Sequence, residues 1–281
     1  MSRRTPLHPG TDPQCKSCLG EGYLVERDGE RALARPCVCS EQCPQCRDTG
    51  WIAVSDERRA RRSRCPHARL SHRITAFNEA GIPARHARST RATFQPTGEP
   101  MQGFMAVNTW LESFVPGEEN RGLVLHGPVG RGKTHLIVAL LRDLVFRHGV
   151  TVRFVEFSHL VGDLKAGFDI GRGTHSLLDP LVHVDVLAID ELGKGRNTEF
   201  EGTIVDELVS RRYNAAVPIL ATTNFAPGTA TGQAAGNMAM GKTSAPNLAD
   251  RVGDRVYSRL RETCDFVPCK GADFREQRRG R

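Results

Sequence analysis

The sequence predicts an α/β fold with a mostly parallel sheet, preceded by a small duplicated zinc-binding region. Three observations support this fold class. A glycine-rich loop over residues 127–134 stands between an apolar run and a helical pattern. Apolar runs and helical patterns then alternate as far as about residue 275, which is typical of a parallel sheet with crossover helices. Seven of the nine cysteines lie within the first 65 residues, at a repeated spacing.

The composition is that of a basic globular protein. Of the 281 residues, 39% are hydrophobic, which is enough for a core, and the formal net charge is +7. A basic balance favours a polyanionic partner, although it is also common on a solvated surface. No apolar run is long enough to cross a membrane, and Met1 to Pro6 lacks the apolar core of a secretory signal. We therefore expect a cytoplasmic protein without a membrane partner.

These patterns also divide the chain. The expected divisions are a duplicated zinc-binding region over 1–70, a linker over 71–100, a nucleotide-binding domain over 101–275 with a flexible insertion over 226–247, and a basic tail over 276–281. Gly81-Ile82-Pro83 interrupts the linker, and the insertion is rich in Gly, Ala and Thr, which is typical of disorder.

The loop at 127–134 fits the pattern G-x-x-x-x-G-K-[ST] of phosphate-binding loops. Its glycines let backbone N–H groups turn toward phosphate oxygens, and the next helix adds its positive N-terminal end to the same anion site. Lys133 places a positive charge on the β- and γ-phosphates, and the Thr134 hydroxyl can hold Mg²⁺. We therefore predict a site for ATP and Mg²⁺ whose binding loop consists of Gly127, Pro128, Val129, Gly130, Arg131, Gly132, Lys133 and Thr134.

Polar residues follow the next apolar runs. Asp190 and Glu191 end a run that begins at Val184. Beside a phosphate loop, Asp190 would hold Mg²⁺ directly or through water, and Glu191 would polarise the attacking water. Asn224 ends the following run, and its amide can orient that water against the γ-phosphate. These residues predict ATP hydrolysis, with Glu191 and Asn224 as catalytic residues.

The other elements follow from periodicity and stop signals. We expect strands at 122–126, 151–157, 184–190, 217–222 and 264–268. We expect helices over 101–114, from the end of the loop to a stop at Gly149, from an N-cap at Ser158 to Lys165, over 199–213, and from Asn247 to Arg261. A glycine-rich segment is expected over 167–173, and Cys264 and Cys269 are interpreted as packing cysteines.

The N-terminal cysteines form an internal repeat of 28 residues. Each unit offers two ligand pairs separated by 18 residues, which suits tetrahedral zinc. Four ligands leave no open position, so the predicted role is structural, and metal would supply folding energy that so small a segment lacks. The simplest assignment is one zinc on Cys15, Cys18, Cys37 and Cys39 and a second on Cys43, Cys46, Cys65 and His67. An interleaved pairing of the ligands is the alternative.

Two further features accompany the zinc units. Residues 57–69 hold an arginine cluster that suits phosphates or an acidic protein surface, and on charge alone a solvated face is equally expected. The stretch Cys15 to Gly22 resembles the C-x-x-C-x-G-x-G unit of DnaJ-type chaperone zinc domains. Only this copy fits, so we interpret it as a shared zinc turn.

From about Gly81 to Arg275 the chain resembles the DnaC/IstB branch of AAA+ ATPases. The resemblance rests on stretches that occur in the family's order: 127–134, 186–193, 221–224, 253–260 and Asp273-Phe274-Arg275. It implies an AAA+ P-loop fold. The zinc-bearing N-terminus is similar to that of DnaI-type helicase loaders, although the doubled zinc unit and the 226–247 insertion depart from that pattern.

The resemblance also implies roles for individual residues. Asn224 matches sensor 1, Arg275 matches sensor 2 at the nucleotide, and Arg259 matches the catalytic arginine finger that reaches the γ-phosphate of a neighbouring subunit. A finger that acts on a neighbour implies an ATP-dependent homo-oligomer. Arg255, one turn earlier on the same helix face, is the alternative finger, and a surface ion pair is the other interpretation of either arginine.

The function implied is that of a helicase loader, a DNA replication protein that assembles with ATP on single-stranded DNA while its zinc region docks the replicative helicase. The alternatives are an IstB-like transposition helper and a zinc-dependent chaperone adaptor regulated by nucleotide. In this ATPase branch, single strands follow the segment from Phe157 to Lys165 and beyond. Lys165 and Arg172 are then expected on phosphates, and Phe157 or Phe168 on bases, unless Phe157 belongs to the core.

Overall fold

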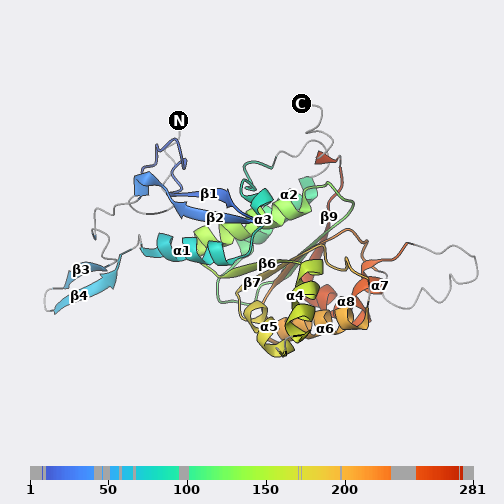
Figure 1. The fold of residues 1–281 in the computed structure, drawn as a ribbon. Helices are drawn as coiled ribbons and strands as arrows, with labels where there is room; N and C mark the ends of the chain where they lie inside the picture. Colours follow the sequence, from blue (N-terminus) through green and yellow to red (C-terminus); the bar gives the residue numbers. More distant parts are fainter. Residues whose placement is uncertain are drawn as a thin grey trace, which may run out of the picture. The chain divides into compact units, whose positions relative to one another are not determined.

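The computed structural model describes residues 8, 11–40, 46, 51–56, 59–65, 68–94, 101–169, 171, 173–196, 198–228, 245–271 and 273–274. The chain divides into two compact units (Figure 1). The first unit comprises Met1–Arg88 and Arg142–Thr151, and the second comprises Ser89–Leu141 and Val152–Arg281.

The second unit is built on a parallel sheet. Its strands are β5 (Gly122–His126), β6 (Val152–Glu156), β7 (Val186–Asp190), β8 (Ile219–Thr223) and β9 (Cys264–Pro268), in the order β6-β7-β8-β5-β9. Every neighbouring pair is parallel. Every residue of β7 and β8 is buried, as expected for strands covered on both faces. The α/β class with a parallel sheet is confirmed.

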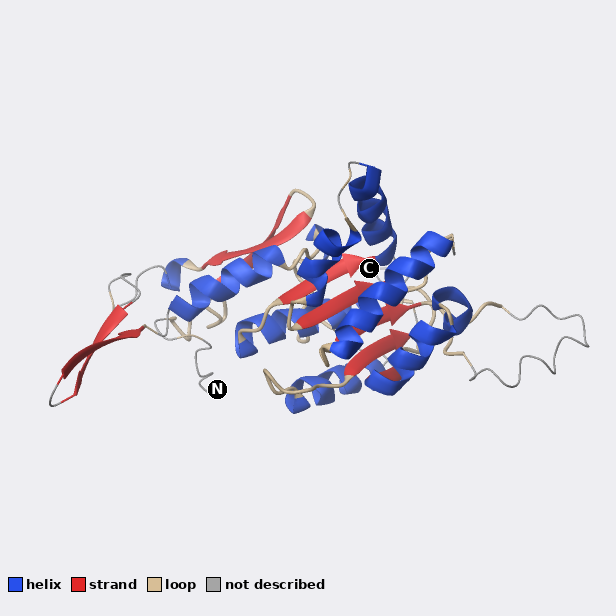
Figure 2. Cartoon of the chain, turned by 90° about the horizontal axis from the view of Figure 1, so that it is seen from below, coloured by secondary structure: helices blue, strands red, loops and turns tan. Residues whose placement is uncertain are grey.

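Helices cover both faces of this sheet (Figures 1 and 2). On one face lie α2 (Met101–Ser113) and α3 (Lys133–Asp143). On the other lie α4 (Phe157–Asp169), α5 (Thr174–Val182), α6 (Glu199–Asn214), α7 (Leu248–Val252) and α8 (Asp254–Thr263). The second group forms one buried cluster with alternate residues of the strands, such as Leu187 and Ile189. Among the described helices, none combines the length and apolarity needed to cross a membrane.

Several boundaries of the predicted elements are confirmed. The strands at β5 and β9 match in full, and α2 and α6 differ from expectation by a single residue at one end. The stop at Gly149 is a left-handed C-cap with φ of +73°, although the last turn before it is a π-helix, η3 (Leu144–His148). Asn247 is an N-cap as predicted, because its side chain and that of Asp250 form a reciprocal capping box.

Other predictions were wrong in detail. Ser158 does not cap α4, because that helix begins at Phe157 and the Ser158 hydroxyl donates to the Glu156 carboxylate at 2.8 Å. The expected glycine-rich segment is partly helical, since α4 continues to Asp169, and α5 follows it. The single helix expected from Asn247 is broken at Gly253, where φ is +85°. Residues 229–244 of the expected insertion lie outside the described residues.

The first unit contains two antiparallel hairpins that repeat one another. The first pairs β1 (Tyr23–Asp28) with β2 (Arg31–Pro36), and the second pairs β3 (Trp51–Asp56) with β4 (Arg59–Arg64). Every partner in the second register lies 28 residues after its counterpart, so that Tyr23–Pro36 becomes Trp51–Arg64. The duplication seen in the cysteines therefore extends to the backbone.

Aromatic packing holds the first unit together. The Tyr23 ring stacks on Phe146 of η3 with a centroid distance of 3.5 Å, and Phe77 lies 5.4 Å from the same ring. Phe77 belongs to α1 (Ala68–Glu79), which is followed by the short helix η2 (Ala84–His86). The Arg73 guanidinium also donates to the carbonyl of Phe146 at 2.6 Å. The linker expected over 71–100 thus begins with a packed helix that belongs to the first unit.

Candidate functional site

The predicted phosphate loop joins the end of β5 to the start of α3. It turns at Gly127, Gly130 and Gly132, with φ of +137°, +78° and +77°. Glycine is also required by space, because a Cβ at Gly127 would lie 2.5 Å from the Cys269 carbonyl oxygen, and one at Gly132 would lie 2.6 Å from the Phe94 ring. The loop therefore has the backbone shape that lets N–H groups converge on an anion at a helix N-terminus.

Lys133 is buried at the centre of this loop, with 7% of its surface exposed. Its Nζ donates to the carbonyls of Gly127 and Pro128 at 2.6 and 2.7 Å, and to Oδ1 of Asn224 at 2.9 Å. Burial lowers the pKa of Lys133. The structure thus brings Asn224, just beyond β8, to the predicted phosphate-binding cation.

Asp190 ends β7 and is also buried. Its Oδ1 accepts from the Thr134 hydroxyl at 2.8 Å and from the Thr222 hydroxyl at 2.5 Å. Burial raises the pKa of Asp190, and the two hydroxyl donors act in the opposite direction. A carboxylate next to a hydroxyl at a phosphate loop is an oxygen donor set that fits Mg²⁺.

Glu191 has φ of +55°, which is rare for a residue with a side chain and is typical of functional sites. Its N–H donates to the Thr222 hydroxyl at 2.9 Å, and its carboxylate forms an ion pair with Lys194. Lys194 also lies 3.9 Å from Glu156 at the end of β6. Sequence reasoning missed both Thr222 and Lys194. The available signal was a hydroxyl at the strand end before Asn224 and a cation three residues after Glu191.

The C-terminal Asp-Phe-Arg stretch reaches the same loop. The N–H of Phe274 donates to the Gly130 carbonyl at 3.0 Å, and a Cβ at Gly130 would collide with the Asp273 carboxylate. The ring of Phe94 lies 5.3 Å from that of Phe274, so a residue assigned to the linker contributes to the site. Arg275 itself lies outside the described residues.

Arg259 and Arg255 do not lie at the loop but on α8. Arg259 donates to Asp206 of α6 at 2.9 Å, and its side chain is 20% exposed. Arg255 lies 3.5 Å from the other oxygen of Asp206 and is 72% exposed. Both predicted fingers are therefore ion-paired in the single chain, as the surface interpretation expected, and Arg255 is the more accessible.

The cysteines of the first zinc unit lie together. The Sγ atoms of Cys15, Cys18, Cys37 and Cys39 are all within 4.8 Å of one another, with Cys15–Cys37 at 3.7 Å and Cys18–Cys39 at 3.5 Å. A tetrahedral zinc with Zn–S bonds of about 2.3 Å separates its sulfurs by roughly 3.8 Å, so the four thiols fit this metal. The N–H of Gly22 donates to the Cys18 sulfur at 3.3 Å, as thiolate ligands often require. The simple pairing, not the interleaved one, accounts for this set.

For the second unit the described residues give half of the predicted site. Cys46 and Cys65 are buried together with Ile52 packed against them. The other two predicted ligands, Cys43 and His67, lie outside the described residues. A second zinc on these four residues stays a prediction.

The expected DNA path finds mixed support. Phe157 is 4% exposed and belongs to the core cluster, so it is not available for base stacking. Lys165 is exposed on α4. Arg172 and the side chain of Phe168 lie outside the described residues.

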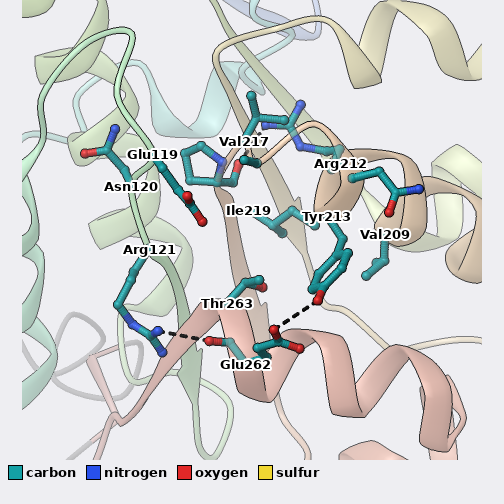
Figure 3. A pocket seen from close by; sticks show the side chains of 13 residues that line it. Glu119, Asn120, Arg121, Val209, Arg212, Tyr213, Val217, Ile219, Glu262 and Thr263 are labelled. Atoms are coloured by element: carbon teal, nitrogen blue, oxygen red, sulfur yellow. Dashed lines mark hydrogen bonds between the residues drawn. The ribbon is translucent and has the colours of Figure 1, made fainter.

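A pocket of about 670 Å³ lies at the other end of the strands (Figure 3). It is lined by Arg121, which precedes β5, by Ile219, which begins β8, and by Tyr213 and Glu262. The Tyr213 hydroxyl donates to the Glu262 carboxylate at 2.9 Å. None of the residues of the phosphate loop lines this pocket, so it is not the nucleotide site.

Comparison with known proteins identifies relatives of this arrangement. The replicative helicase loader DnaC of Escherichia coli K12 is 27% identical over 187 residues, which cover 66% of this chain and 68% of that protein. A protein named as the ATP-binding protein of an insertion sequence in Mycobacterium tuberculosis is 32% identical over 201 residues, covering 69% of this chain and 70% of that one.

Solved structures agree in fold. The crystal structure of the DnaC helicase loader matches with a TM-score of 0.55 and 26% identity, over 66% of this chain and 99% of that one. The crystal structure of DnaI matches with a TM-score of 0.51 and 20% identity, which supports the fold alone. The model of the family of IstB-like ATP-binding proteins matches residues 107–281, which is more than half of the sequence. With its phosphate loop, acidic strand end and C-terminal stretch on this scaffold, the chain belongs to the IstB-like ATP-binding protein family.

Proposed function

We propose that this protein is an ATP-dependent DNA replication protein of the helicase-loader type, which hydrolyses ATP and assembles on single-stranded DNA. One observation carries the proposal. At the carboxyl edge of the sheet, Lys133, Thr134, Asp190 and Asn224 are linked by direct hydrogen bonds of 2.8 and 2.9 Å. Because they come from three different strand ends, the edge is built for a ligand with phosphates and a cation.

In this proposal each residue has a separate task. The loop amides and Lys133 bind the β- and γ-phosphates, Thr134 and Asp190 hold Mg²⁺, and Asn224 orients the attacking water. Glu191 acts on the same water as a base, with Lys194 setting the direction of its carboxylate. Mg²⁺ neutralises charge that develops on the phosphoryl group.

Assembly is the second part of the proposal. Arg259 would act on the nucleotide of a neighbouring subunit, after exchanging its ion pair with Asp206 for the phosphate. The greater exposure of Arg255 makes it the alternative. Either assignment requires a homo-oligomer for hydrolysis, since an isolated chain keeps both arginines on α6.

The replicative helicase is the proposed client, and the zinc-bearing first unit is the proposed contact. The similarity to the DnaC loader over two thirds of both chains supports this choice. The relative from an insertion sequence supports a second candidate function, an ATPase that assists transposition. The two candidates share the nucleotide site and differ in the client.

Two measurements test the proposal. Lys133→Ala should abolish ATP binding, and Glu191→Gln should bind ATP but hydrolyse it at least a hundredfold more slowly, because the water loses its base. Glu112→Gln, an exposed carboxylate on α2, is the matched control and should behave as the unaltered protein. Normal turnover by Glu191→Gln would exclude that residue from its role.

The client is tested separately by capture. The full chain should retain the replicative helicase of the same genome, and a chain without residues 1–70 should not. Capture of a transposase instead of the helicase would favour the transposition candidate, and capture of unfolded proteins in general would favour a chaperone adaptor.

A further inference from the structure

The two hairpins of the first unit have one fold but opposite surroundings. In an antiparallel pair, residues directly opposite one another point to the same side, and sides alternate along each strand. In the second hairpin, the register opposes Trp51 to Arg64 and Ala53 to Arg62, so that these four positions share one face. Ile52, on the opposite face, packs against the buried Cys46 and Cys65. The first face is therefore the one turned away from the cysteines, and we call it the Trp51 face.

The corresponding face of the first hairpin is covered by protein. Tyr23, the counterpart of Trp51, is 3% exposed beneath the ring of Phe146. Ala34, the counterpart of Arg62, is 4% exposed, and Asn78 of α1 bonds both its N–H and its carbonyl. Small and aromatic residues at these positions suit a packed face.

The Trp51 face is instead exposed and has changed its chemistry. Trp51 is 47% exposed, and Ala53 and Arg62 are exposed as well. A tryptophan and an arginine stand where the first copy has a buried tyrosine and alanine. An indole of that size in water is unfavourable unless a partner covers it, whereas lone exposed aliphatic residues are common.

The charge of the hairpin indicates which partner. Strand β4 has the sequence Arg-Ala-Arg-Arg-Ser-Arg and contains no acidic residue, and β3 contains only Asp56. Arginine pairs with phosphate through its planar fork, and an indole face stacks on nucleobases of any kind. An acidic protein surface would use the arginines but has no use for an exposed indole beside them. Single-stranded nucleic acid presents both phosphates and unstacked bases.

We propose that the Trp51 face of the β3–β4 hairpin binds single-stranded DNA, with Trp51 stacking on a base and Arg62 and Arg64 on the flanking phosphates. This surface is separate from the nucleotide site and does not need ATP. It rests on the proposed function only in taking DNA as the polyanion.

Tryptophan fluorescence tests the stacking directly, because the chain has two tryptophans in different surroundings. Trp110 is 7% exposed, and its Nε1 donates to the Arg121 carbonyl at 2.7 Å. Titration of the nucleotide-free, full-length protein with an oligothymidylate should quench part of the emission, and Trp51→Phe should lose that quenching while the emission of Trp110 remains. Quenching that persists in Trp51→Phe would overturn the proposal.

Affinity and salt dependence test the rest. Trp51→Ala should weaken oligothymidylate binding by about 5- to 150-fold, which corresponds to one stacked base at roughly 1–3 kcal/mol. Arg62→Ala with Arg64→Ala should reduce the slope of log K against log salt by about 1.4, since each phosphate contact on a single strand contributes about 0.7. Arg27→Ala with Arg31→Ala, which removes two exposed arginines from the first hairpin, is the control of equal charge. The control should keep the slope, and equal losses in both double variants would mean that only net charge matters.

The source of the polyanion is settled by competitors. A duplex of the same length, or polyglutamate, should compete at least tenfold less well than the oligothymidylate. Equal competition by polyglutamate would indicate an acidic protein partner and overturn the DNA assignment, and equal competition by duplex would overturn single-strand preference. ATP turnover should stay normal in the hairpin variants, so failure here leaves the ATPase proposal standing. Failure of turnover in the unaltered protein would defeat that proposal alone.

Discussion

Arg212 offers the sharpest test of how the sheet edge is supported. It lies in α6 with no exposed surface and donates to five carbonyl oxygens, those of Leu181, Val182, Val184, Asp185 and Pro218. Val184 and Asp185 precede β7, and Pro218 precedes β8. Figure 3 shows Arg212 near Val217 and Ile219 at the start of β8. One cation thus fastens the two strands whose far ends carry Asp190 and Asn224.

The energy at stake follows from the bonds. Four of the five are 3.1 Å or shorter, at 2.7, 2.8, 3.0 and 3.1 Å. Burial lowers the pKa of Arg212 to about 10, so it stays charged at neutral pH while the carbonyls replace its water. At about 1 kcal/mol net for each short bond, Arg212→Met should destabilise the protein by about 4 kcal/mol. Methionine keeps the length and apolar volume, so the loss reports mainly on the donors.

The neighbouring residue supplies the control. Arg211 is 21% exposed and forms an ion pair with Asp179, which is 40% exposed. Such a pair contributes at most about 1 kcal/mol, so Arg211→Met should change stability little. Urea unfolding followed by circular dichroism measures both variants. A loss below about 1 kcal/mol for Arg212→Met, or equal losses for the two variants, would refute the reasoning.

Three further predictions concern metal, assembly and pH. Elemental analysis of the purified protein should find two zinc ions per chain, and Cys37→Ser should lose one of them; one ion or none in the unaltered protein would exclude the two-site assignment. Arg259→Ala should bind ATP normally but hydrolyse it on the order of 10³-fold more slowly. Mixing it with Lys133→Ala should restore turnover, and no recovery under conditions that assemble the unaltered protein would direct attention to Arg255. Burial, followed by the charge of Arg73, lowers the pKa of His8 to about 4. Because this folded value lies below the unfolded one of about 6.5, the stability due to neutral His8 is full above pH 6.5 and falls as the pH drops toward 4, so His8→Asn should unfold with a weaker pH dependence over that window, and an unchanged dependence would exclude His8 as its source.

The parts of the fold that the sequence by itself determined are those with local causes. The phosphate loop follows from glycines at 127, 130 and 132, whose positive φ angles are read from the residue type. The cap at Asn247 and the stop at Gly149 act within one helical turn. The 28-residue repeat determined both hairpins, since equal sequences of strand and turn residues produce equal registers.

The contacts within the candidate site depended on the tertiary structure. Lys133 meets Asn224 across 91 residues, and Asp190 meets Thr222 across 32. These pairs exist because β8 lies between β7 and β5, an order that periodicity along one chain segment does not contain. The same holds for Phe94 and Phe274 at the loop, and for Arg212 beneath the strands. Local signals decide where an element begins and ends, whereas the neighbours of a side chain are decided by the packing of many elements at once, because burial is shared among residues far apart in the sequence.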